Sequence, residues 1–159
     1  MANIFLTRRE VLVGTLAMTA LPNVANASEK HIKVLKDPNC GCCSEWAEIL
    51  TSNGFTVKIE NMPNSLLVGA KMEAGVPPSM ASCHTAFIDS YVIEGHVPVA
   101  DIKRLLFEMP KGMGLAVPGM PYGSPGMGPE DKREAYDVML MQRDGSSSVF
   151  SRYTARARI

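Results

Sequence analysis

The cysteines of this chain are confined to two short segments, which restricts the folds that it can adopt. Three of the four lie in Cys40-Gly41-Cys42-Cys43, and the fourth belongs to Ser82-Cys83-His84-Thr85. Residues 31–36 alternate polar and apolar side chains, which predicts a strand, and residues 44–53 show the spacing of an amphipathic helix. The three-thiol segment is therefore predicted at a strand-to-helix junction. There the free N–H groups of the helix and the positive end of its dipole favour thiolate over thiol.

The remaining elements extend this junction into an α/β fold. We predict strands over residues 55–60, 86–89 and 91–94, a helix over residues 66–74 with Ser65 as its N-cap, and a third helix that Pro98 opens. The resulting order is β-α-β-α-β-β-α. With C-x-x-C at the first junction and Val76-Pro77 before the third strand, it resembles the thioredoxin-like fold, in which that proline is usually cis.

The last third of the chain changes character. Residues 109–129 are rich in glycine, proline and methionine, so no regular helix or strand is expected there. Within this loop, Pro118-Gly119-Met120 is repeated as Pro125-Gly126-Met127. Residues 136–142 and 148–153 then predict a C-terminal β-hairpin around Asp144-Gly145.

The first 27 residues predict an export signal. Arg8-Arg9 precedes an apolar run over residues 11–21, and Ala25-Asn26-Ala27 provides a small-x-small cleavage site. The run is shorter than the about 20 residues of a membrane span. The paired arginines resemble the twin-arginine signal, and the alternative is an ordinary secretory signal. We therefore expect cleavage near Ala27 and a single periplasmic domain over residues 28–159.

The charge of the chain restricts its partners. Sixteen basic residues balance sixteen acidic ones, with no basic stripe, so nucleic acid is not an expected partner. No second long apolar segment follows the signal, so stable membrane insertion is not expected either. We expect a partner protein in the periplasm that donates or accepts metal. The sequence makes no prediction about the oligomeric state of the protein.

The thiol segments predict a soft-metal site. Thiolates beside imidazole suit Cu(I), with Zn(II) as the alternative, and Cu(I) accepts two or three sulfurs whereas structural zinc prefers four ligands. A third thiol adds a donor to such a site but invites mispairing in a two-cysteine redox couple, so Cys42 favours metal. The predicted primary ligands are Cys40, Cys42, Cys43, Cys83 and His84.

Other side chains are weaker candidates for a secondary metal site. His96 lies in a strand-to-helix turn and is interpreted as structural rather than as a ligand. Met113, Met120 and Met127 could supply thioether donors or a lid, since thioethers are not lost to disulfide formation. The alternative is that these methionines fill gaps under an irregular loop.

We therefore predict a periplasmic copper carrier or buffer, which serves metal tolerance or the loading of a cuproprotein. Three alternatives remain. The first is an enzyme, a thiol-disulfide oxidoreductase using Cys40 and Cys43 as its redox pair. The second is a structural zinc domain, and the third is a pair of plain disulfide bridges, for which adjacent cysteines are poorly placed. We find no phosphate-binding loop, H-E-x-x-H motif or nucleophile elbow.

Several motifs together resemble one protein family. These are Lys36-Asp37-Pro38-Asn39-Cys40-Gly41-Cys42-Cys43, Ser82-Cys83-His84-Thr85-Ala86, Tyr91-Val92-Ile93-Glu94-Gly95-His96-Val97-Pro98 and Leu115-Ala116-Val117-Pro118-Gly119-Met120-Pro121. They resemble the exported bacterial proteins of the domain of unknown function 411 family, which are described as metal-binding or copper-associated. The resemblance implies a thioredoxin-like domain of the cell envelope, connected with copper or other soft metals. It brings no settled activity.

Overall fold

The computed structural model describes residues 30–156, which form a mixed α/β structure with a seven-stranded sheet and three α-helices. The predicted signal over residues 1–27 lies outside the described residues. The elements in chain order are β1 (Lys30–Lys36), α1 (Gly41–Ser52), β2 (Phe55–Asn61), α2 (Asn64–Glu73), η1 (Pro78–Met80), β3 (His84–Ile88), β4 (Tyr91–Glu94), α3 (Val99–Glu108), β5 (Gly114–Ala116), η2 (Glu130–Lys132), β6 (Tyr136–Met141) and β7 (Ser147–Tyr153). Within this part of the chain, no helix is both long enough and apolar enough to cross a membrane.

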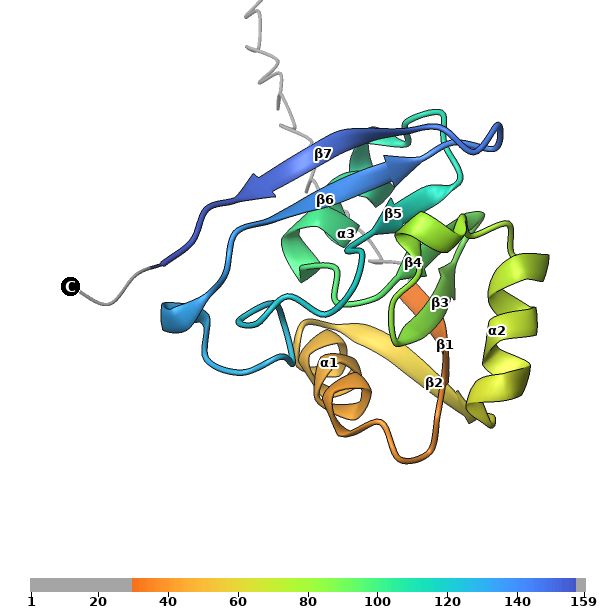
Figure 1. Cartoon of the computed structure of the whole chain (residues 1–159), viewed down its shortest axis with the longest axis horizontal. Coiled ribbons are helices and arrows are strands. Elements are labelled where there is room, and N and C mark those ends of the chain that lie inside the picture. Colours follow the sequence, from red (N-terminus) through yellow and green to blue (C-terminus); the bar gives the residue numbers. More distant parts are fainter. Residues whose placement is uncertain (1–29, 157–159) are drawn as a thin grey trace, which may run out of the picture.

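The sheet topology brings the two cysteine segments together. The strand order is β2-β1-β3-β4-β5-β6-β7, with β1–β2 and β4–β5 parallel and the other pairs antiparallel. Helix α1 connects the parallel strands β1 and β2, as a parallel pair requires (Figure 1). Because β3 runs antiparallel to β1, the last residue of β1, Lys36, pairs with the first residue of β3, His84. The chain that leaves β1 and the chain that enters β3 therefore meet at one edge of the sheet.

Helices cover both faces of the sheet. On one face, α1 and α3 pack against the strands in the larger apolar core, in which Trp46, Leu50, Ile102 and Leu105 are fully buried. The indole Nε1 of Trp46 donates a hydrogen bond to the Val97 carbonyl at 2.9 Å, so the ring has both an apolar body and a satisfied polar atom.

The opposite face carries a smaller apolar cluster, which contains Val76, Val92, Met113, Ala116 and Met141. Helix α2 lies on this side, apart from α1 and α3 (Figure 1), and its C-cap residue Ala74 packs against the cluster.

Much of the predicted element order is observed. The strands and helices from β1 to α3 follow the β-α-β-α-β-β-α order, and β6 and β7 form the predicted C-terminal hairpin. In the turn of this hairpin, the Asp144 carboxylate accepts hydrogen bonds from the backbone N–H and hydroxyl of Ser146. The mixed α/β class of the prediction is therefore confirmed.

Three local predictions are wrong. The segment 109–129 does contain a strand, β5 (Gly114–Ala116). Its neighbours β4 and β6 hold it extended by hydrogen bonds, and the segment itself carries no strand pattern. Helix α2 has Pro63 rather than Ser65 at its N-cap, because the Pro63 carbonyl accepts the N–H groups of Leu66 and Leu67 and the helix therefore starts two residues earlier. All described peptide bonds are trans, including the one before Pro77, which adopts an extended conformation at the start of η1.

Candidate metal centre

A tight turn after β1 sets the position of the first three cysteines. The Asp37 carboxylate accepts the Asn39 N–H at 2.9 Å, and the Asp37 carbonyl accepts the Cys40 N–H at 3.0 Å. Cys40 occupies the N-cap position of α1, and Cys42 and Cys43 lie in the first turn of the helix. The thiols therefore lie at the positive end of the helix dipole, as the sequence predicts.

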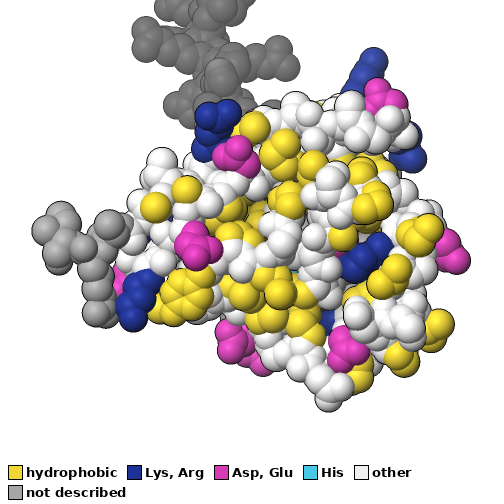
Figure 2. Space-filling model, viewed as in Figure 1, with side chains coloured by type: hydrophobic (Ala, Val, Ile, Leu, Met, Phe, Trp, Pro, Cys, Tyr) yellow, Lys and Arg dark blue, Asp and Glu magenta, His cyan; other side chains and the backbone are white. Residues whose placement is uncertain are grey.

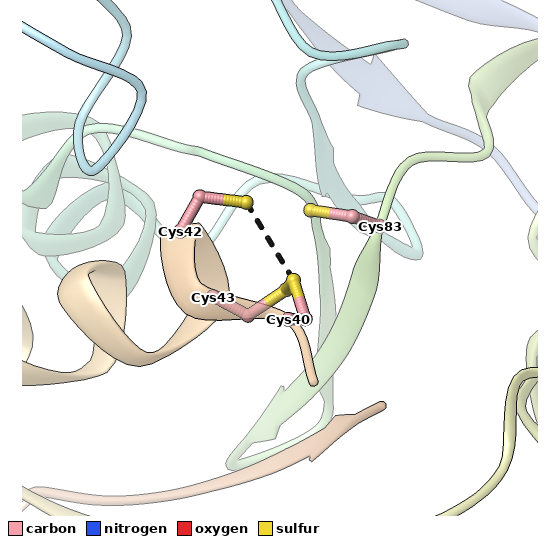
Figure 3. A group of neighbouring side chains, drawn as sticks. All are labelled: Cys40, Cys42, Cys43 and Cys83. Carbon is pink, nitrogen blue, oxygen red and sulfur yellow. Dashed lines mark hydrogen bonds between the residues drawn. A yellow bond between two sulfur atoms is a disulfide. The ribbon is translucent and has the colours of Figure 1, made fainter. Parts of the chain in front are cut away.

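The sulfur atoms of these residues are close together. Cys40 and Cys43 form a disulfide with a Cα–Cα distance of 5.4 Å, and the Cys42 Sγ lies 3.5 Å from the Cys40 Sγ. Cys43 is fully buried, whereas Cys42 is a free, partly exposed thiol. Figure 3 shows Cys42 and Cys40 at the start of α1, with their sulfurs facing the fourth cysteine.

Cys83 approaches this group from the segment that leads into β3 (Figure 3). The sulfurs of Cys40, Cys42, Cys43 and Cys83 all lie within 4.8 Å of one another. Burial raises the pKa of the Cys83 thiol to about 12, and the neighbouring Cys42 sulfur acts in the same direction. Cys83 is therefore a protonated thiol near neutral pH, and a metal that binds it must displace that proton.

Two histidines extend the group on the side of Cys83. The Cys83 Sγ lies 3.3 Å from Nδ1 of His84 and 2.9 Å from Nε2 of His96. Ligand atoms of Cys83, His84 and His96 lie within 4.8 Å of one another. Both imidazoles are fully buried, and no histidine is visible on the face drawn in Figure 2.

The hydrogen bonding of His96 determines which ring nitrogen faces Cys83. The His96 Nδ1 lies 2.7 Å from the Pro125 carbonyl oxygen, which can only accept, so Nδ1 carries the proton. In the neutral ring, Nε2 then directs its lone pair at the Cys83 sulfur. Metal-binding histidines usually have this arrangement, with one nitrogen donating to a carbonyl and the other free to bind.

The surroundings of both histidines favour the neutral ring. Burial, with the nearby His96 and Lys71, holds the pKa of His84 well below its ordinary value. Burial also lowers the pKa of His96, although the hydrogen bond to Pro125 opposes this. Within the described residues, Nε2 of His84 has no hydrogen-bond partner, which is uncommon for a buried polar atom. The neutral imidazole is the form that binds metal, so the donor set fits a soft ion.

The Gly/Pro/Met-rich loop lies against this site. Pro125 contacts His96, and the next residue, Gly126, lies so close to α1 that an added Cβ would be 2.8 Å from the Cys42 carbonyl oxygen. Further along the chain towards the N-terminus, the Gly119 carbonyl accepts a hydrogen bond from the Ser82 hydroxyl. The loop therefore touches both cysteine segments.

The methionines of the loop do not share one environment. Met113 is buried in the smaller apolar cluster, on the opposite face of the sheet from Trp46. Met120 is 56% exposed, and Met127 is partly buried. The structure therefore does not bring Met113 together with the other two as one set of donors.

The primary ligand candidates of the sequence analysis all lie in this one place, and His96 joins them. From the sequence, we interpreted His96 as structural because it lies in a strand-to-helix turn. The available signal was the short connection between the predicted strands 86–89 and 91–94, which favours an antiparallel hairpin. In the structure β3 and β4 are antiparallel, and Thr85 pairs with Glu94. This register places the residues just before β3 beside those just after β4.

Comparison with known proteins identifies the family. Residues 80–127 match the family model described as "Protein of unknown function, DUF411". Two solved structures, both of the copper resistance protein CopG (Form 1 and Form 2), are each 46% identical and cover 79% of this chain and 98% of their own. Their TM-scores are 0.73 and 0.72.

The chain belongs to the DUF411 family. The predicted resemblance is therefore confirmed. No curated protein matches the chain. The DUF411 model covers the Cys83 segment and most of the Gly/Pro/Met-rich loop, and the CopG structures extend the likeness across most of the described fold.

Proposed function

We propose that this protein binds Cu(I) in the periplasm, through the four cysteines with His84 and His96, and acts as a copper carrier or buffer. The observation that carries the proposal is the cluster of four sulfurs within 4.8 Å, because the sequence has no cysteine outside it. Thiolate and imidazole donors select soft metals. The name of the similar CopG structures, copper resistance protein, supports copper over zinc.

Features of the fold and of the sequence support the proposed role as a copper carrier. The element order and the thiols at the start of α1 support a thioredoxin-like domain, and the twin-arginine-like leader supports export with cleavage near Ala27. A carrier needs ligands that an incoming partner can reach. Cys42 and Cys83 are partly exposed, so a donor or acceptor protein could exchange its thiols with them one at a time.

Loading with copper requires reduction of the Cys40–Cys43 disulfide. A dithiol reductant supplies two electrons and two protons, which convert the disulfide into two thiols and leave the reductant oxidised. The thiols then release their protons as they bind the metal. Copper binding is therefore expected to depend on the redox state of this pair.

An anaerobic competition titration tests the proposal. The reduced protein is titrated with Cu(I) in the presence of a chromophoric Cu(I) chelator, and the copper taken from the chelator is measured. We expect about one or more copper ions per chain. If the chelator retains all the copper, the proposed function is wrong.

The Cys40–Cys43 disulfide also favours a second function, that of a thiol-disulfide oxidoreductase. The substitution Cys42→Ser separates the two functions, because a redox couple needs only Cys40 and Cys43 whereas the metal site loses a donor. For a copper carrier, we expect Cys42→Ser to weaken Cu(I) binding strongly. Unchanged copper binding, together with disulfide reductase activity that the substitution leaves intact, would favour the oxidoreductase.

A further inference from the structure

A buried ion pair lies beside the copper site, on the other side of the sheet from Trp46. The Nζ of Lys71, from α2, lies 2.6 Å from Oε1 of Glu94, the last residue of β4. The hydroxyl of Thr85 accepts a hydrogen bond from Lys71 at 2.9 Å and donates one to Oε2 of Glu94 at 2.7 Å. The Glu94 side chain is completely buried.

Stability alone does not account for such a pair. Removing two charges from water is unfavourable, and apolar residues of similar size often stabilise a protein as well or better. The Lys71–Glu94 pair is therefore expected to have a further role, for which its other contacts are informative.

Glu94 connects the pair to the cysteine cluster. Its Oε1 accepts the backbone N–H of Ser82 at 2.6 Å, and Ser82 immediately precedes Cys83. Ser82 lies outside β3, so no neighbouring strand is available to accept this N–H. The carboxylate takes the place of a strand partner and holds the segment that carries the Cys83 thiol.

Two further contacts fix the same residue. The Ser82 hydroxyl donates to the Gly119 carbonyl, and the Ser82 side chain occupies space that a side chain at position 95 would need. Ser82 is thus held through its N–H, its hydroxyl and its packing against Gly95. These contacts hold the backbone immediately before Cys83.

We propose that Glu94, held by Lys71 and Thr85, is a positioning residue that sets the Cys83 thiol for copper binding. The inference rests on the proposed copper function. Its physical basis is the hydrogen bond that Glu94 accepts from the Ser82 N–H, rather than the negative charge itself. Groups that orient metal ligands in this way typically change metal affinity by about 10–100-fold when they are removed.

Two double variants separate the hydrogen bond from the charge. Lys71→Met with Glu94→Leu removes both charges and also the acceptor for Ser82. Lys71→Met with Glu94→Gln removes the same charges but keeps a carbonyl oxygen as acceptor. Neither variant leaves an unpaired buried charge. Asp101→Asn is the matched control, since Asp101 is a buried carboxylate that accepts hydrogen bonds from Ser151 and Tyr153 instead.

Cu(I) competition measures the effect on the site, and thermal unfolding monitors the fold. We expect the Leu variant to bind Cu(I) about 10–100-fold more weakly, while the Gln variant and Asp101→Asn stay within a few-fold of the original protein. An equal loss in the Leu and Gln variants would overturn the proposal, as would unchanged affinity in the Leu variant. A loss of affinity that simply follows the thermal midpoint across all three variants would also overturn it.

A second measurement without metal keeps this inference distinct from the copper function. In the metal-free protein, the rate of Cys83 alkylation is measured by mass spectrometry of the modified peptide. We expect at least a roughly tenfold faster rate in the Leu variant, because the released segment exposes the thiol, and little change in the Gln variant. If the original protein binds no copper, the proposed function fails, whereas the alkylation rates still decide whether Glu94 positions Cys83. Equal alkylation rates in all variants would refute the positioning role.

Discussion

The two Pro-Gly-Met repeats of the loop provide a direct test of how it packs on the metal site. Gly119 and Gly126 both adopt left-handed backbone conformations, with φ of +69° and +79°. A Cβ at Gly119 would meet nothing within 4 Å. A Cβ at Gly126 would lie 2.8 Å from the Cys42 carbonyl oxygen and 2.9 Å from the Trp46 backbone nitrogen. Substitution by alanine therefore introduces the same backbone strain at both positions but a steric clash only at Gly126.

The expected magnitudes differ accordingly. An alanine in the left-handed region costs roughly 1–2 kcal/mol, and the reduced freedom of the unfolded chain offsets about 0.4–1 kcal/mol of this. Gly119→Ala should thus destabilise the protein by about 1 kcal/mol. Gly126→Ala adds the overpacking of rigid backbone atoms, about 1–3 kcal/mol. It also weakens the Pro125–His96 hydrogen bond, worth about 1 kcal/mol.

Urea unfolding of the metal-free protein at fixed redox state measures the free energy of unfolding for both variants. We expect Gly126→Ala to be less stable than Gly119→Ala by at least about 1 kcal/mol, or roughly 4 °C in Tm. Equal destabilisation of the two variants would show that the loop does not pack on the start of α1. A larger destabilisation by Gly119→Ala than by Gly126→Ala would contradict the predicted steric clash at Gly126.

Three further predictions concern Cys83, Trp46 and Gly114. In the metal-free protein at pH 8, Cys83 should react with iodoacetamide about 100-fold more slowly than a small-molecule thiol. Its pKa is raised to about 12, which lowers the thiolate fraction by more than about 1000-fold, and the greater nucleophilicity of a more basic thiolate offsets only part of this. The rate should rise steadily as the pH approaches the pKa, and comparable rates at pH 8 would contradict this. Trp46→Phe leaves the buried Val97 carbonyl without its donor, so chemical denaturation should show a loss of about 1–3 kcal/mol, and no loss would exclude a role for this hydrogen bond. Gly114→Ala would place a Cβ 1.8 Å from the Val92 carbonyl oxygen, so we expect circular dichroism to show a protein that fails to fold. A folded variant would mean that β5 can move away from β4.

Sequence patterns were sufficient where one segment carries its own signal. The alternation in β1 and the amphipathic spacing of α1 predict both elements, because these periodicities reflect which face of each element is buried. The hairpin turn is similarly local, since Asp144 and Gly145 provide the required turn chemistry. The cysteine ligand candidates follow from residue type alone, because the chain places its four thiols in only two segments.

Strand β5 shows where local pattern fails. Gly114 and its neighbours have no strand signal, and the segment is extended because β4 and β6 bind it on both sides. Glu94 and Lys71 were not predicted as site residues for a related reason. They are 23 positions apart in the sequence, and only the packing of α2 on the sheet brings them together.

The sequence by itself determined the donor chemistry of this protein, namely soft donors at a strand-to-helix junction, and an even balance of basic and acidic residues. The tertiary structure decided the geometry of the centre. His96 became a neighbour of Cys83 because β3 and β4 are antiparallel and the Pro125 carbonyl fixes its ring. Residue types carry donor chemistry wherever they lie, but distances between donors depend on long-range pairing, which no single segment encodes.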